Sequence, residues 1–305
     1  MRDVQTLIVD KIDEIRERIG QGEAMVALSG GVDSMTCAVL AHRAIGERLR
    51  AVFIDDGLMR EGEPESVLGL CDQIGISLEV MDVQDQFFRS LKGARDPEEK
   101  RRRFRDQFYA VFKRAVRDSG CGHLIQGTIA ADIAETKGGI KTQHNVLEQI
   151  GIGYDVRIVE PIKELYKDEV RVLARELELP HEVCERMPFP GPGLAIRVLG
   201  EVTPERVAKV RIATKIVEEE VSALKPFQAF AVLMSDRATG LCDGGRLYGD
   251  IVTVRVVESK DAMTASVPEI PYEILDRIRR RITDGSAVKV LFDLTPKPPS
   301  TIEYE

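Results

Sequence analysis

Residues 24–34 have the sequence AMVALSGGVDS, and this segment decides the fold class. Its first five residues are apolar and suit a buried strand, while Ser34 is placed to open a following helix. Gly30 and Gly31 allow a tight turn between the two elements. The amides at the start of the helix and the two serine hydroxyls would face an anion, so the segment predicts a phosphate-binding turn.

The turn carries an aspartate where a P-loop carries a lysine. In a P-loop, a lysine follows the glycines and meets the β and γ phosphates, whereas Asp33 occupies that neighbourhood here. An aspartate beside a polyphosphate indicates a bound Mg²⁺. The alternative is a glycine-rich strand-to-helix turn that binds nothing and uses Ser34 as a helix cap.

Length and charge set the outer bounds. A chain of 305 residues with 43% hydrophobic side chains can bury one large core or two modest ones, and we expect two domains. The formal net charge of −8 is the wrong sign for a protein that binds along a phosphate backbone. We therefore expect no nucleic-acid partner.

Cysteine usage and hydropathy predict the compartment. The five cysteines are widely spaced and form no C-x-x-C pair, which favours reduced thiols over a disulfide framework or a zinc site. No apolar run approaches the roughly 18 residues that a membrane span needs. The expectation is a cytoplasmic protein without a membrane partner.

Strands and helices are predicted to alternate through the first part of the chain. An amphipathic helix over 4–19 precedes the strand at 24–28. Further strands are expected at 51–54, 78–83, 124–127 and 156–161, with helices at 64–71, 97–119 and 167–177. This alternation predicts an α/β fold with a doubly wound, mainly parallel sheet, whose ligand lies at the carboxyl ends of the strands.

An aperiodic segment interrupts this pattern at 129–153. A stretch of that length without hydrophobic periodicity is often a lid or a binding loop, and the alternative is a surface excursion. It holds Asp132, Glu135, Lys141 and His144. Two carboxylates, a lysine and a histidine form a plausible set for metal, phosphate and proton handling.

The densest proline and glycine cluster, PFPGPG at 188–193, predicts a domain boundary. The expected domains are therefore 1–187 and 188–305. Beyond the boundary, helices are predicted at 204–224 and 272–282, and strands at 229–234, 251–257 and 288–294. This pattern indicates a small α+β domain.

Two charged segments are candidates for ligand binding. The first, DPEEKRRRFRDQF, begins a helix at Asp96 and crowds four arginines together, of which one or two aimed at a cleft would clamp a phosphate. The others are expected to be solvated and paired with Glu98 and Glu99. The second, KPPSTIEYE at 297–305, is a charged tail of a kind that normally frays.

Several motifs together resemble a known family. SGGVDS is similar to the signature of the ATP pyrophosphatases, which cleave ATP between the α and β phosphates. The chain from 25 to 305 resembles the GMP synthetases in a series of motifs that occur in this order: SGGVDS, FIDDGLMR, DPEEKR, QGTIAADIAE, IKTQHN, EPIKELYKDEVR, PFPGPGLAIRVLGE and KPPSTIEYE. A glutamine amidotransferase domain is missing, so the resemblance is to the separate synthetase subunit of the two-subunit archaeal form.

The resemblance implies a ligase that forms a carbon–nitrogen bond. Its substrates would be ATP, xanthosine monophosphate (XMP) and ammonia, and its products GMP, AMP and pyrophosphate, formed through an adenylyl-XMP intermediate with Mg²⁺ as cofactor. It implies a glutaminase subunit as the partner that supplies ammonia and a homodimer formed by the C-terminal domain. It also implies an adenine nucleotide alpha hydrolase-like fold for the first domain.

The resemblance further implies roles for individual residues. The residues that would bind ATP, with Asp33 as the metal ligand, are Ser29, Gly30, Gly31, Val32, Asp33, Ser34, Met35, Gly127 and Thr128. The catalytic residues would be Asp132, Glu135 and Lys141. Those that would bind XMP are Arg101, Arg237, Lys297, Ile302 and Glu303.

The sequence departs from the family pattern at two positions. Gln143 stands where the family often has the first of two adjacent histidines, so a proton role of that histidine does not carry over. Tyr304 stands where the terminal motif usually has tryptophan.

Two alternative functions stay open at this point: another ATP pyrophosphatase, of the NAD synthetase or tRNA thiolase type, and a nonenzymatic nucleotide-binding assembly protein.

Overall fold

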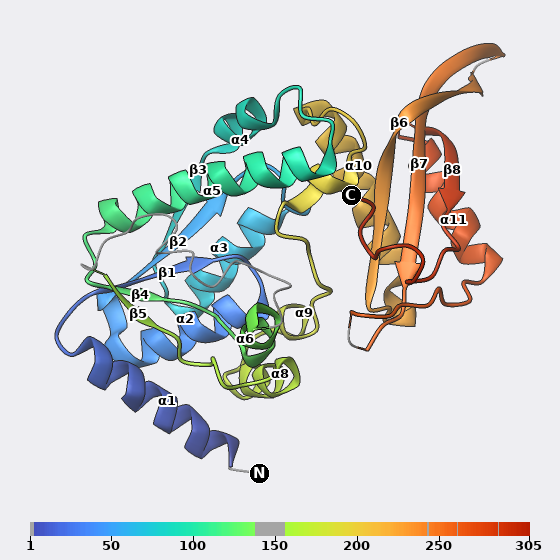
Figure 1. The fold of residues 1–305 in the computed structure, drawn as a ribbon. Helices are drawn as coiled ribbons and strands as arrows, with labels where there is room; N and C mark the ends of the chain where they lie inside the picture. The colour runs from blue at the N-terminus through green and yellow to red at the C-terminus, as the bar shows by residue number, and fades with distance from the viewer. Residues whose placement is uncertain (1–2, 138–155, 243, 261, 286) are drawn as a thin grey trace. The chain divides into compact units, whose positions relative to one another are not determined.

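The computed structural model describes residues 3–137, 156–242, 244–260, 262–285 and 287–305 (Figure 1). The chain forms two compact units. The first unit consists of Met1–Asp55, Gly62–Asp82 and Phe108–Arg186. The second consists of Asp56–Glu61, Val83–Gln107 and Met187–Glu305. Two short segments that precede residue 108 therefore belong to the same unit as the C-terminal part.

The first unit is built on a five-stranded sheet in the order β3-β2-β1-β4-β5. All four neighbouring pairs are parallel, which confirms the predicted fold class. The strands are β1 (Ala24–Leu28), β2 (Leu49–Asp55), β3 (Leu78–Asp82), β4 (His123–Ile125) and β5 (Arg157–Val159). The central β1 is apolar along its length because helices cover the sheet on both sides.

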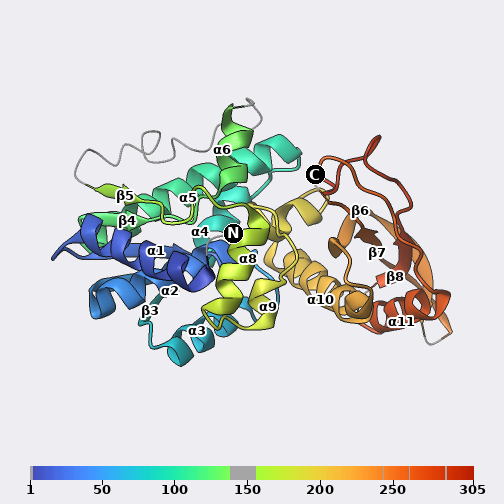
Figure 2. The same cartoon turned by 90° about the horizontal axis from the view of Figure 1, so that it is seen from below.

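Helices on one side of this sheet are α1, α2 and α8, which contact one another (Figures 1 and 2). The carboxyl-terminal half of α5 covers the opposite side. The α-helices described in the unit are α1 (Val4–Ile19), α2 (Val32–Ile45), α3 (Glu63–Ile74), α6 (Ala130–Lys137), α8 (Lys167–Glu176) and α9 (His181–Cys184), with α5 spanning Pro97–Ser119. Helix α2 is buried over most of its surface, which suits its apolar sequence.

The second unit is built on a three-stranded mixed sheet in the order β6-β7-β8. Strands β6 (Gln228–Cys242) and β7 (Gly245–Val257) form an antiparallel hairpin, and β8 (Ala287–Phe292) pairs with β7 in parallel. Helices α10 (Pro204–Val221) and α11 (Tyr272–Thr283) pack on this sheet and on each other. This is the expected small α+β domain.

The earlier segments of the second unit carry their own hydrophobic contacts. Helix α4 (Gln84–Leu91) was not predicted from the sequence. Its Phe87 is fully buried and lies 5.1 Å, centroid to centroid, from the ring of Phe104 on α5. Asp96 accepts a hydrogen bond from the amide of Glu99 at 2.9 Å, which confirms the predicted start of α5.

The prediction of an aperiodic segment at 129–153 was wrong at its beginning. Helix α6 spans Ala130–Lys137. Its start is stabilised locally, because the Asp132 carboxylate accepts a hydrogen bond from the amide of Ile129 at 3.1 Å. Residues 138–153 lie outside the described residues, so the rest of the predicted lid stays a prediction.

The hairpin of the second unit extends well beyond the predicted strands. The sequence placed them at 229–234 and 251–257, where most residues are apolar and buried. The pairing continues past a register shift between Leu233 and Arg237 and reaches Cys242 and Gly245. Most residues of this extension are exposed, polar and apolar alike, so backbone hydrogen bonds define it and hydrophobic patterning does not.

Membrane-spanning helices and cysteine pairing can be examined in the described residues. None of their helices is both long and apolar enough to cross a membrane. Four cysteines, Cys37, Cys71, Cys121 and Cys184, are unpaired and buried.

The PFPGPG segment leads into the 3₁₀ helix η3 (Gly193–Arg197) through a close backbone contact. The amide of Leu194 donates a hydrogen bond to the carbonyl of Leu58 at 2.8 Å. Gly193 has a φ of +58°, and a Cβ placed there would lie 2.4 Å from the same carbonyl oxygen. Only glycine fits this position without displacing the backbone.

We predict that Gly193→Ala destabilises the protein by about 2 kcal/mol or more, because it adds a left-handed backbone penalty to a clash with Leu58. The measurement is the midpoint of thermal or urea unfolding. Gly191→Ala is the matched control, since a Cβ at Gly191 meets no atom within 4 Å. Equal midpoints for the two variants would contradict the assignment.

Candidate functional site

The SGGVDS turn lies at the switch point of the parallel sheet. From β1 the chain passes to β2 and β3 on one side and later to β4 and β5 on the other. In open α/β sheets, ligands bind outside the carboxyl ends of the strands at such a point. The turn follows β1 directly and leads into α2, so the first amides of this 14-residue helix lie at the same edge.

Two serines close the turn on itself. The amide of Ser29 donates to Ser34 Oγ at 3.2 Å, and the two hydroxyl oxygens are 3.1 Å apart. Ser34 Oγ in turn donates to the carbonyl of Gly31 at 3.1 Å. These bonds fix the turn in shape before any ligand is bound.

The sequence prediction that Ser34 opens the helix was wrong. Helix α2 begins at Val32, and Gly31 is its N-cap residue with extended backbone. Because Ser34 is the third residue of the helix, its hydroxyl reaches back across the turn and bonds Ser29 and Gly31. A helix that begins two residues earlier brings the amides of Val32 and Asp33 into the anion-binding first turn.

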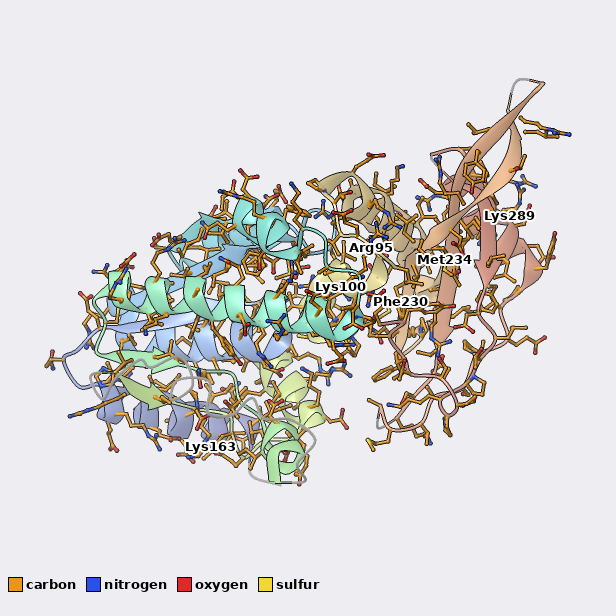
Figure 3. The ribbon with its side chains drawn as sticks, turned by 45° about the horizontal axis from the view of Figure 1, so that its top comes forward. Arg95, Lys100, Lys163, Phe230, Met234 and Lys289 are labelled. Atoms are coloured by element: carbon orange, nitrogen blue, oxygen red, sulfur yellow. The ribbon has the colours of Figure 1, made fainter. Side chains whose placement is uncertain are left out.

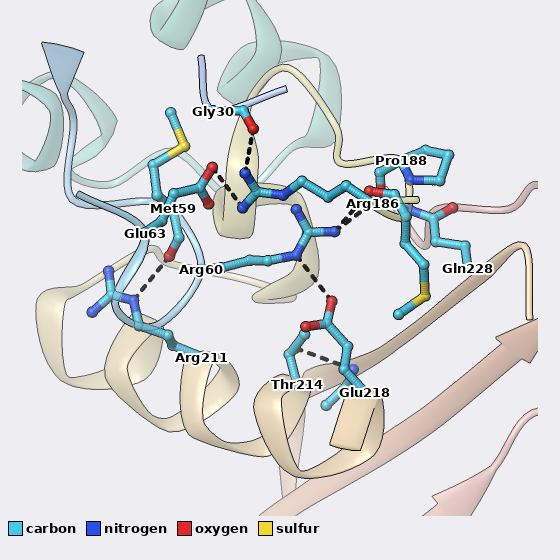
Figure 4. Close-up of polar contacts among 12 residues, drawn as sticks. Gly30, Met59, Arg60, Glu63, Arg186, Pro188, Arg211, Thr214, Glu218 and Gln228 are labelled. Carbon is cyan, nitrogen blue, oxygen red and sulfur yellow. Dashed lines mark hydrogen bonds and ion pairs between the residues drawn. The ribbon is translucent and has the colours of Figure 1, made fainter. Parts of the chain in front are cut away.

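An arginine holds the carbonyl side of the turn. Gly30 has a φ of +71°, and its carbonyl accepts a hydrogen bond from Arg186 Nη1 at 2.6 Å. Arg186 Nη2 also pairs with the buried carboxylate of Glu63 at 2.8 Å (Figure 4). A Cβ at Gly30 would lie within 2.8 Å of both partners. Charge and packing therefore both fix the Gly30 peptide.

Asp33 is paired on one oxygen only. Lys167, the first residue of α8, donates from Nζ to Asp33 Oδ2 at 2.6 Å. Asp33 Oδ1 is buried, and no hydrogen-bond partner is found for it among the described residues. A buried carboxylate oxygen without a donor is costly and suits a cation ligand. The described residues contain no group of three or more His, Cys, Asp or Glu side chains that would hold a metal without help from a ligand.

Gly127 and Thr128 follow β4 beside the turn. A Cβ at Gly127 would lie 3.0 Å from the carbonyl carbon of Asp33 and 3.1 Å from the amide nitrogen of Ser34. Thr128 Oγ1 donates to Glu160 at 2.7 Å. The structure thus brings Gly127 against the turn, as expected from the order of the strands, while Thr128 contacts Glu160 just after β5.

The three predicted catalytic residues are only partly visible. Asp132 is described and caps the start of α6 through Ile129. Glu135 lies in α6, but its side chain is outside the described residues, and Lys141 is outside them entirely. Their catalytic roles stay predictions.

The C-terminal tail, residues 297–305, is held in place by three basic side chains of the second unit that are 0% exposed: Lys100, Arg197 and Arg255. The sequence expectation that the tail frays was therefore wrong. A buried cation must be paired, and each of these three finds its partner in the tail. Lys100 projects from α5 (Figure 3).

Arg255 binds the tail through its backbone. Its Nε donates to the carbonyl of Ile302 at 2.8 Å and its Nη2 to that of Thr301 at 2.7 Å. Its Nη1 pairs with Asp293 at 2.7 Å. Burial raises the pKa of Asp293, but hydrogen bonds from Thr295 and the charge of Arg255 outweigh it and leave the pKa below its usual value.

Arg197 binds the tail through Glu303. Its Nε and Nη2 donate to the two carboxylate oxygens at 3.0 and 2.9 Å, and Gln228 donates to the same carboxylate at 2.7 Å. Gln228 also donates to the carbonyl of Pro188 at 3.2 Å. The predicted XMP residue Glu303 is therefore tied to the segment that precedes η3.

Lys100 and Arg101 bind the last residue. Lys100 Nζ donates to the carbonyl of Val198 at 2.7 Å and pairs with the Glu305 carboxylate. Arg101 donates to the main-chain oxygen of Glu305. Burial lowers the pKa of Lys100 and raises that of Glu305, and their mutual attraction opposes both shifts. Two predicted XMP residues, Arg101 and Glu303, thus both belong to the set of contacts that holds the end of the tail.

The side chains of Lys297 and Arg237, two further residues predicted to bind XMP, make other contacts. Lys297 donates from Nζ to the carbonyl of Ala262 at 2.8 Å. Arg237 donates to the carbonyl of Tyr248 at 2.5 Å and lies 3.6 Å from Asp250 on β7. Neither has a contact with Glu303 among the described interactions.

The chain matches two family models in sequence. Residues 4–191 match the model described as NAD synthase, and residues 204–304 match the model described as GMP synthase C terminal domain. Proteins named as a subunit of glutamine-hydrolyzing GMP synthase, from Thermococcus kodakarensis and Pyrococcus furiosus, are 53% and 51% identical to it, over 99% of this chain and 99% and 97% of theirs. The one from Methanopyrus kandleri is 50% identical over the full length of both chains.

The chain belongs to this family of GMP synthase subunits. Members of the family are ligases that form carbon–nitrogen bonds. The resemblance identified from the motifs is confirmed. The NAD synthetase and tRNA thiolase alternatives lose their support, because residues 204–304 match the GMP synthase C terminal domain and the GMP synthase relatives match nearly the whole chain.

The sequence analysis gave no role to several residues that contact the SGGVDS turn or the C-terminal tail. Lys167 lies in EPIKELYKDEVR and Arg197 in PFPGPGLAIRVLGE, two motifs that carried the resemblance without being given a role. The absence of a lysine in the turn was a usable signal for Lys167, since a cation has to come from elsewhere. Lys100 adjoins the four predicted arginines and was passed over because burial of a lysine is not visible in the sequence.

We predict that Gly127→Ala weakens ATP binding about tenfold or more, because the new Cβ pushes on the Asp33 and Ser34 backbone that forms the turn. Calorimetric titration with ATP measures this. Gly122→Ala, at a position where a Cβ meets nothing within 4 Å, is the matched control. An unchanged affinity in Gly127→Ala would show that the turn does not bind the nucleotide.

Proposed function

We propose that this chain synthesises GMP from XMP, ATP and ammonia, with release of AMP and pyrophosphate through an adenylyl-XMP intermediate. The observation that carries the proposal is the SGGVDS turn at the carboxyl end of the central strand, with Asp33 in place of the P-loop lysine. The relatives named as GMP synthase subunits support the identity of the product.

The turn is suited to hold the leaving pyrophosphate. The first amides of α2 and its positive dipole end attract an anion, and the serine bonds preorganise the turn. Lys167 brings a positive charge to Asp33 from a separate helix. A ligand phosphate would therefore meet fixed donors, which stabilise the charge that develops as the bond to the α-phosphate breaks.

Asp33 fits a Mg²⁺ ion that accompanies ATP. Its Oδ1 is buried without a donor, and Mg²⁺ typically takes one or two protein carboxylates together with phosphate oxygens. Bound there, the ion would neutralise charge on the leaving pyrophosphate. Lys167 would then be free to contact phosphate oxygens, since the carboxylate would no longer need it.

The predicted lid would complete the site. Asp132, Glu135 and Lys141 are proposed to act on the reaction itself, with Lys141 neutralising negative charge at the α-phosphate. Closure would protect the adenylylated purine from hydrolysis, because a reactive intermediate is lost in open water.

The second unit is proposed to bind XMP through the residues of the arginine helix, the hairpin and the tail: Arg101, Arg237, Lys297, Ile302 and Glu303. It is also proposed to form a homodimer, which its exposed apolar side chains support. These include Leu241 at 82% exposure, Leu294 at 73% and Tyr248 at 59%. Ammonia would come from a separate glutaminase, as the word glutamine-hydrolyzing in the relatives' names supports.

We predict that the chain with ATP, Mg²⁺, XMP and ammonium at raised pH forms GMP, AMP and pyrophosphate in equal amounts. Separation of the nucleotides by chromatography, together with a pyrophosphate assay, measures the ratio. Formation of ADP and phosphate would indicate a kinase or ATPase. ATP binding without pyrophosphate release on addition of XMP would favour the nonenzymatic alternative.

We predict that Lys141→Ala lowers the rate of AMP and pyrophosphate formation about 100-fold while leaving the unfolding midpoint nearly unchanged, because it removes a charge that acts in the transition state. Lys163→Ala, which removes an exposed lysine of the first unit, is the control. Turnover at the unmodified rate in Lys141→Ala would assign the lysine to a solvated loop.

A further inference from the structure

We propose that Arg197 is a positioning residue for XMP, which acts by fixing the carboxylate of Glu303. The inference rests on the proposed function, because it assigns Arg197 to the binding of that substrate. It adds a residue that the motif resemblance gave no role. Arg197 lies at the end of η3, within the second unit.

Arg197 presents its guanidinium to Glu303 in a bidentate arrangement. Nε reaches one carboxylate oxygen at 3.0 Å and Nη2 the other at 2.9 Å. Such a paired contact fixes the plane of the carboxylate as well as its place, which a single hydrogen bond does not do. A lysine at the same position would supply charge without this orientation.

Two aromatic rings hold the guanidinium itself. Its central carbon lies 4.0 Å from the ring centroid of Phe230 and 5.0 Å from that of Phe189. Phe230 belongs to β6 (Figure 3), and Phe189 belongs to the PFPGPG segment. Arg197 is 0% exposed, so these cation–π contacts act without competition from water. The arginine therefore has one well-defined position.

A second arginine, Arg60, also contacts the ring of Phe189. Arg60 lies 4.4 Å from the same ring centroid, and it is anchored by Glu218 at 3.0 Å and by the carbonyl of Met187 at 3.0 Å (Figure 4). The PFPGPG segment and the tail are thus joined through one chain of contacts from Arg60 through Phe189 and Arg197 to Glu303. All of these residues belong to the second unit.

Glu303 keeps capacity for a ligand in this arrangement. An ionised carboxylate accepts about four hydrogen bonds. Arg197 supplies two and Gln228 a third, which goes to Oε1. Among the described residues no second donor to Oε2 is found, so one acceptor position stays available there, and its direction is fixed by the bidentate pair. The group that it selects is a hydrogen-bond donor, such as a ring N–H or a ribose hydroxyl of a purine nucleotide.

Arg197→Lys tests the inference, because it retains the buried charge and removes the bidentate geometry. With ammonium as nitrogen donor, we expect the KM for XMP to rise about tenfold or more, while kcat and the KM for ATP stay within about twofold. Arg206→Lys is the matched control. Arg206 is a half-buried arginine of the same unit whose guanidinium binds the carbonyls of Glu201 and Met234.

A double-mutant cycle with Glu303→Gln separates positioning from general stabilisation. If Arg197 acts through Glu303, the KM for XMP of Arg197→Lys combined with Glu303→Gln equals that of Glu303→Gln alone. A purely structural role would instead multiply the two effects. Unfolding midpoints of all variants provide the measure of stability.

The outcomes distinguish this inference from the proposed function. GMP formation by the unmodified protein tests the function alone, and its absence would overturn both. An active protein in which Arg197→Lys leaves the KM for XMP unchanged, or multiplies with Glu303→Gln, would overturn the role of Arg197 and leave the function standing.

Discussion

Buried positive charge is the constraint on which the second unit depends. Lys100, Arg197 and Arg255 have no exposed surface, and a charge in such a place is tolerated only when it is paired and hydrogen-bonded. All three find partners in the C-terminal tail, through a mixture of carboxylates and main-chain carbonyls. The tail is therefore held in place by buried charges, although none of its own residues is buried, and its polar groups are what pair with those charges.

In the SGGVDS turn of the first unit, the partly buried charge is negative instead of positive. Asp33 is anionic and partly buried, and its two oxygens differ: one is paired with Lys167, and the other has no donor among the described residues. The turn is otherwise closed by its own serines and by Arg186. It is a preorganised arrangement in which most hydrogen bonds are satisfied and a few groups are left for a ligand, which is the condition for electrostatic stabilisation without reorganisation.

Much of this could be predicted from the sequence where hydrophobic periodicity carries the signal. The parallel sheet, α1 and α5 follow from apolar patterning and from the start signal at Asp96. The extension of β6 to Cys242 does not, because it is mostly exposed and is formed through backbone pairing. The residues of the candidate site also divide into those that a sequence motif reveals and those that only the fold reveals. SGGVDS and Gly127 were found as motifs, whereas Lys167 and Arg197 are brought to their partners only by contacts between residues more than 100 positions apart.

The discontinuous composition of the second unit has a consequence for how the protein is made. Asp56–Glu61 and Val83–Gln107 are synthesised long before Met187–Glu305, with which they form a compact unit. Contacts of such high sequence separation are slow to form, since closing the long loop between them costs conformational entropy. During synthesis Lys100 has no partner in the tail until the last residues leave the ribosome. A single cut at the PFPGPG segment therefore cannot divide the protein into two self-sufficient halves.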